Sequence, residues 1–85
     1  MNQYRRSAYA YTQDYKKQLQ SMMIEIEGDI TDMRCIIFEI EQEAEDESRE
    51  MTKEEKLDCE EYRHAIEDLE EAQEAIHAII RELRG

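Results

Sequence analysis

The sequence of 85 residues contains no proline and no tryptophan, and its only two glycines are Gly28 and Gly85. An all-β sandwich or barrel needs a turn about every 8–12 residues, usually built with glycine or proline, so that fold class is excluded. The longest apolar run covers residues 35–38, whereas a membrane-spanning helix needs about 18 apolar residues or more. Residues 1–20 lack the apolar core of a secretory signal. We therefore expect a single cytoplasmic domain with no membrane contact.

Cysteines and catalytic motifs are equally scarce. The two cysteines, Cys35 and Cys59, are too few for a disulfide-held scaffold and favour a reducing compartment. The sequence has no Ser-His-Asp set, no glycine-rich phosphate loop and no Cys-x-x-Cys motif. We therefore predict that the protein is not an enzyme and has no catalytic residues.

Two Glu-x-x-His motifs, 61–64 and 74–77, have the spacing of ligands in di-iron helical bundles. Ligands in such bundles project inward. At 100° per residue, most of these four side chains point away from the apolar stripe of their helix. We therefore predict no metal site and no cofactor.

Apolar residues are spaced for two helices. In the first half they recur with a mean step of about 3.6 residues, the period of an α-helix; Tyr4, Tyr15, Ile26 and Ile37 lie 11 apart. A second stripe alternates steps of three and four residues, with Gln73 filling one of its positions, and is closer to a heptad. The second stripe comprises Cys59, Tyr62, Ile66, Leu69, Ile76, Ile80 and Leu83.

The apolar pattern is interrupted between the two stripes, around residues 45–52. Thr52 and Glu55 have the spacing of a capping box, which marks a helix start. We predict an all-α antiparallel helical hairpin, with helices at about 3–47 and 53–84. One continuous helix is the alternative, because the predicted turn contains neither glycine nor proline.

The first helix also carries apolar residues opposite its main stripe. Ile24, Cys35 and Phe38 fall on this outer face, which one hairpin cannot cover. Gly28 lies on the same face, where it either permits a close helix approach or only weakens the helix. We predict self-association into a homodimer or larger helical bundle, with Ile24, Cys35 and Phe38 at the interface.

Charge is segregated along the chain. Residues 1–20 hold four basic groups against one acidic group, whereas the whole chain has a net charge of −12. The second helix is too short to cover residues 1–18, so these form a basic, tyrosine-rich overhang beyond the acidic hairpin of residues 19–84. Aromatic rings can stack on nucleobases while basic groups hold phosphates. The overhang is thus a candidate nucleotide or cyclic-dinucleotide site formed by Tyr4, Arg5, Arg6, Tyr9, Tyr11, Tyr15 and Lys16; the simpler alternative is that it packs on a partner subunit.

Carboxylates concentrate at the predicted turn. A net charge of −12 exceeds the magnitude of about 2–8 that keeps a small domain soluble. Rows of carboxylates can imitate the phosphates of a duplex and bind a basic protein surface, and they argue against direct nucleic-acid binding. The predicted partner-binding residues, here called the acidic tip, are Glu39, Glu41, Glu43, Glu45, Asp46, Glu47 and Glu50.

These features predict a non-catalytic acidic binding protein. Its expected role is to inhibit or recruit a nucleic-acid-handling or defence protein, as small acidic proteins of phages and other mobile elements do. Sequestration of a nucleotide by the overhang is one alternative. A purely structural coiled-coil oligomerisation module is the other.

Overall fold

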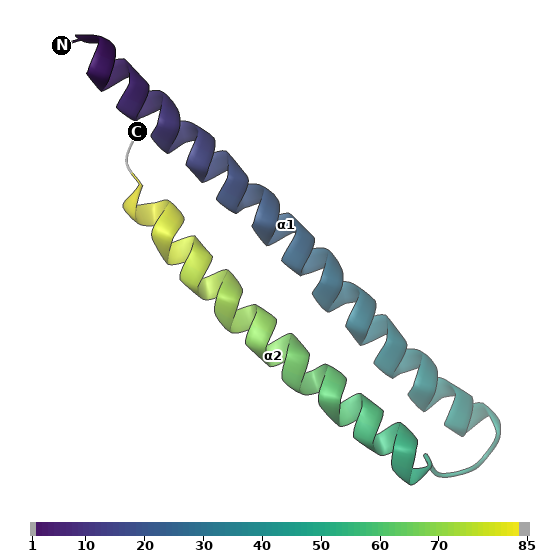
Figure 1. Ribbon diagram of the computed structural model, residues 1–85. Helices are drawn as coiled ribbons and strands as arrows, with labels where there is room; N and C mark the ends of the chain where they lie inside the picture. Colours follow the sequence, from purple (N-terminus) through teal and green to yellow (C-terminus); the bar gives the residue numbers. More distant parts are fainter. Residues whose placement is uncertain (1, 84–85) are drawn as a thin grey trace.

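The protein is a hairpin of two long helices in a computed structural model that describes the backbone of residues 2–83 and the side chains of residues 10–83. Helix α1 spans Asn2–Asp46 and helix α2 spans Lys53–Glu82. The two run antiparallel along a rod of 71 × 16 × 15 Å (Figure 1). The predicted hairpin is therefore confirmed, and the continuous helix is not what forms. The observed ends of the helices lie within two residues of the predicted ones.

One apolar seam between the helices forms the core. A buried cluster of Ile30, Ile37, Cys59 and Ile66 occupies its centre. The described residues include no buried polar or charged side chain. Both apolar stripes of the sequence therefore face each other, as their helical spacing predicts. None of the described helical segments is long and apolar enough to cross a membrane.

The end of α1 is closed by hydrogen bonds that a glycine usually supports. The Arg49 amide donates to the Ala44 carbonyl over 3.0 Å, and the Ser48 amide donates to the Glu45 carbonyl over 3.0 Å. This pair of bonds is the Schellman motif. Ser48 has φ 53°, the only positive φ of a non-glycine residue in the described backbone. Serine here takes the left-handed conformation that normally favours glycine.

The start of α2 is capped as the sequence predicts. The Glu55 amide donates to Thr52 Oγ1 over 3.1 Å, and the Thr52 amide donates to Glu55 Oε1 over 2.8 Å. Arg49 donates to Glu55 over 2.8 Å and to Glu47 over 2.6 Å. The hydrogen bond from Arg49, followed by that from the Thr52 amide, lowers the pKa of Glu55 to about 2. One arginine thus ties the turn to the first turn of α2.

Because α2 is shorter than α1, the start of α1 extends beyond the last residue of α2. Cross-helix contacts join Arg34 to Glu70 and Glu27 to Gln73. These pairs place the end of α2 at Glu82 opposite α1 residues near 18–22. The purple start of α1 accordingly extends past the yellow end of α2 (Figure 1). The overhang is helical from Asn2 onward.

Candidate functional site

The acidic tip is exposed along its whole length. All seven of its acidic residues are exposed. Three of them have partners: Glu41 with Arg63 at 3.0 Å, Glu47 with Arg49, and Asp46 with the Gln42 amide at 3.1 Å. The other four form no ion pair with any described residue: Glu39, Glu43, Glu45 and Glu50.

The tip is the end of a longer row of carboxylates that sequence reasoning missed. Six exposed acidic residues of α1 follow one another in steps of three, four or seven residues, so they share one stripe of the helix. Ile36, between Asp32 and Glu39, occupies the one position of this stripe that is not acidic. The sequence itself contains the signal for this row, because its acidic residues repeat at helical spacing alongside the apolar residues. The stripe, here called the carboxylate row, comprises Glu25, Asp29, Asp32, Glu39, Glu43 and Asp46.

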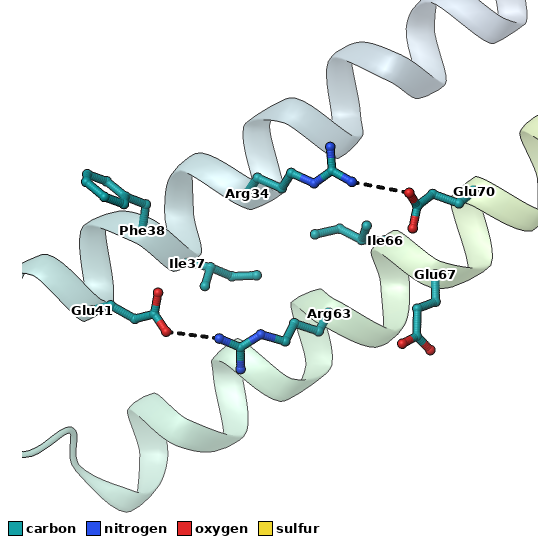
Figure 2. A pocket seen from close by; sticks show the side chains of 8 residues that line it. All are labelled: Arg34, Ile37, Phe38, Glu41, Arg63, Ile66, Glu67 and Glu70. Atoms are coloured by element: carbon teal, nitrogen blue, oxygen red, sulfur yellow. Dashed lines mark hydrogen bonds and ion pairs between the residues drawn. The ribbon is translucent and has the colours of Figure 1, made fainter.

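The two flanks of the hairpin, the long sides where α1 and α2 meet, differ in chemistry. On one flank, Arg34 donates to Glu70 over 3.2 Å and Arg63 donates to Glu41 over 3.0 Å. Figure 2 shows these two ion pairs on either side of Ile37 and Ile66, which point toward each other. We call this side the ion-pair flank.

An open groove of about 460 Å³ runs along the ion-pair flank. Figure 2 shows Phe38 at its edge, pointing away from α2. Its two arginines already pair with Glu41 and Glu70, and Glu67 is its third carboxylate. The groove therefore has no unpaired cation to hold an anionic ligand.

The opposite flank carries mainly apolar side chains at the seam, with the exposed carboxylates of Asp29 and Asp58 among them. At 100° per residue, positions on the far side of both apolar stripes from Arg34 and Arg63 fall here. These side chains range from half-buried to exposed; Met22 is 48% exposed and Ile79 is 40% exposed. We call this side the apolar flank, and it comprises Met22, Ile36 and Ile40 of α1 with Ala65, Leu69, Ala72 and Ile79 of α2.

The overhang exposes the aromatic residues that the sequence placed there. Tyr11 is 74% exposed and Tyr15 is 41% exposed, while Lys16 is partly exposed. These three side chains lie on one short stretch of α1 with no part of α2 over them. The candidate nucleotide-site residues Tyr4, Arg5, Arg6 and Tyr9 lie outside the described side chains.

The predicted oligomer interface is an exposed face of α1. Ile24 is 74% exposed, Phe38 is 63% exposed, and Cys35 is exposed as a free thiol. A Cβ added to Gly28 would meet no described atom within 4 Å, so no close approach between the described parts of the chain explains that glycine. The face is thus available to a partner, and its role as an interface stays a prediction.

The described residues form neither a metal-binding cluster nor an activated thiol. No three His, Cys, Asp or Glu side chains in residues 10–83 gather closely enough to hold a metal ion. His64 lies on the surface, 3.9 Å from Glu60. Cys59 is fully buried, and burial raises the pKa of its thiol. Cys59 therefore acts as a small apolar core residue rather than as a nucleophile.

Comparison with known proteins gives no relative: no family model, no curated protein and no solved structure matches the chain.

Proposed function

We propose that this protein is a non-catalytic binding protein whose acidic tip occupies a basic surface of a nucleic-acid-handling or defence protein. The observation that carries the proposal is the exposed carboxylate row together with the tip. Residues 39–61 hold twelve acidic groups against three basic ones, a net charge of −9. Eleven of the twelve acidic residues are exposed, Glu55 being the exception.

The spacing of the carboxylate row suits a surface that binds nucleic-acid phosphates. Steps of three or four residues along an α-helix correspond to about 4.5–6 Å along its axis, and the one step of seven residues, from Asp32 to Glu39, corresponds to about 10.5 Å. Phosphates follow one another at about 3.4 Å along the axis of a DNA strand, so the two charge densities are of the same order. A basic groove shaped for a duplex would therefore attract this rod, with fast association that falls as salt rises. The protein would act in the cytoplasm as an inhibitor or adaptor, of the kind that phages and other mobile elements encode.

The test compares two charge reversals of equal size. Glu39→Lys, Glu43→Lys and Glu45→Lys together change the tip without touching Glu41, whose carboxylate pairs with Arg63. The control chain carries three reversals on α2, away from the tip, at Glu67, Glu71 and Glu74. These three residues are exposed and form no ion pair with any described residue. Each triple changes the net charge from −12 to −6, because each substitution adds two units.

The readout is inhibition of a panel of bacterial nucleases and of RNA polymerase acting on duplex DNA. We expect the wild-type protein and the control triple to inhibit the same enzyme. Their potency should decrease as the salt concentration is raised from a low to a physiological value. The tip triple should lose most of that inhibition while keeping its helical circular dichroism. Equal loss in both triples would show that net charge alone acts, and would contradict a binding role for the tip.

A second candidate is nucleotide binding by the overhang, because Tyr11 and Tyr15 are exposed beside Lys16. Calorimetric titration with a cyclic dinucleotide and with ATP tests it. Binding that Tyr11→Ala removes, with helix content unchanged, supports this candidate. No heat change with either nucleotide argues against it.

We further propose that the hairpin self-associates into a homodimer or larger bundle. The exposed apolar side chains on two sides of the rod and on the overhang support this, since one hairpin leaves them in contact with water. Light scattering over a concentration series measures the subunit number directly.

A further inference from the structure

We propose that the overhang of one chain docks as a third helix on the apolar flank of a second copy, near its acidic tip. Two such contacts, related by a twofold axis, would form an antiparallel dimer. The proposal rests on the self-association proposed above, and it adds the surface, the orientation and the segments that meet.

The overhang supplies an apolar stripe that its own chain leaves uncovered. Tyr11 and Tyr15 continue the stripe that buries Leu19 and Ile30 further along α1. Tyr11 is 74% exposed whereas Ile30 is 2% exposed. The change comes where α2 ends, because no second helix covers α1 before residue 18 or so. Such a stripe has the spacing that packs a helix into an apolar groove.

The apolar flank supplies the complementary surface. Ile36 is half-buried, yet it is not among the residues that pack against the buried cluster. Ala65 and Ala72 face the same side from α2, and their small side chains allow another helix to approach closely. The three cross-helix polar contacts between the described parts of α1 and α2 do not lie on this side. A third helix seated here would therefore displace no ion pair.

Charge selects a second copy as the occupant and sets its direction. Residues 1–20 have a net charge of +3, and residues 39–61 have a net charge of −9. An antiparallel arrangement places the basic end of each chain beside the acidic end of the other. A parallel arrangement would bring together the two basic ends and also the two acidic ends, and both contacts would be repulsive.

The register follows from the length of α1. If the two α1 helices overlap from Asn2 to Asp46, residue i of one chain faces about residue 48 − i of the other. Tyr11 then lies level with residue 37 of the second copy, beside Ile36 on the apolar flank. The outer face of Ile24, Cys35 and Phe38 points about 150° away from the seam and takes no part in this contact.

Disulfide pairing between two chains tests the orientation. One chain carries Cys35→Ser with Tyr11→Cys, and the other carries Cys35→Ser with Ile36→Cys; Cys59 stays in place because it is fully buried. Within one helix, positions 11 and 36 are about 37 Å apart, so a bond between them must join two chains. We expect mild oxidation of the mixture to give mainly the mixed dimer. Preferential pairing of the Tyr11→Cys chain with itself would indicate a parallel arrangement and overturn the proposal.

Light scattering of single-site variants tests the surface. Ile36→Glu and Tyr11→Glu should each raise the dissociation constant of the dimer by about tenfold or more, because both place a charge in the apolar contact. The dimer has twice the chain mass of 10.3 kDa. Tyr11→Glu lies outside the intramolecular seam, so hairpin folding does not depend on it. Ile24→Glu is the matched control and should leave the dimer intact.

The outcomes separate the two proposals. A protein that stays at 10.3 kDa up to millimolar concentration would overturn both self-association and this inference. A dimer that Ile24→Glu dissociates, and that Tyr11→Glu and Ile36→Glu leave intact, would overturn this inference alone. That second result would assign the interface to the outer face of α1.

Discussion

Ser48→Gly should stabilise the hairpin. Ser48 is held at φ 53° in the turn between the helices, the left-handed region that costs an L-residue about 1–2 kcal/mol. Glycine avoids that cost, but it has more backbone freedom to lose on folding, worth about 0.5–1 kcal/mol. The difference is a net gain of about 0.5–1 kcal/mol in the free energy of unfolding. For a protein of this size, that gain raises the melting temperature by about 2–8 °C.

The assay is urea unfolding followed by circular dichroism at 222 nm, at several protein concentrations. Glu50→Gly is the matched control, since Glu50 lies in the same turn and has no positive φ. There glycine only adds freedom to the unfolded chain, so a loss of about 0.4–1 kcal/mol is expected. The two glycine substitutions should therefore change the free energy of unfolding in opposite directions. A loss of stability with Ser48→Gly would refute the turn geometry and favour one continuous helix.

Three further predictions concern the core, the cap and the thiols. Ile30→Ala should lower the free energy of unfolding by about 2–4 kcal/mol, measured by urea unfolding, because Ile30 is 2% exposed. Glu55→Gln should destabilise the protein most near neutral pH. The folded pKa of Glu55, about 2, lies below its ordinary 4.5, so its contribution is complete above 4.5 and disappears as the pH falls toward 2; melting curves from pH 7 to 2 should show the two chains converging. Alkylation of the native protein should modify Cys35 quickly and Cys59 only on unfolding, as mass spectrometry after timed quenching would report.

Much of the fold could be predicted from the sequence because the controlling interactions are local. The helical period alone places Ile30, Ile37 and Ile66 in the seam, where the structure buries them. The capping box was likewise predictable, since the Thr52 hydroxyl and the Glu55 carboxylate bond to backbone groups only three residues away.

The turn and the two flanks were not predictable in the same way. Serine has no special preference for the left-handed conformation, so nothing in the residue type marks Ser48 as the position that ends α1. The difference between the flanks depends on which residues stand opposite each other across the helices. Arg34 meets Glu70 only because the turn fixes that register. Local spacing carries no information about it.

The rod shape has a consequence for how this chain moves through water. Its radius of gyration is 19.8 Å, whereas a compact chain of 85 residues would have one of about 12 Å. A compact protein needs about 320 residues to reach the same radius. Because an elongated molecule meets more friction than a compact one, this molecule diffuses more slowly and elutes earlier from a sizing column than a compact protein of equal mass. An apparent mass taken from one elution volume would therefore be too high, and even the monomer would be mistaken for an oligomer.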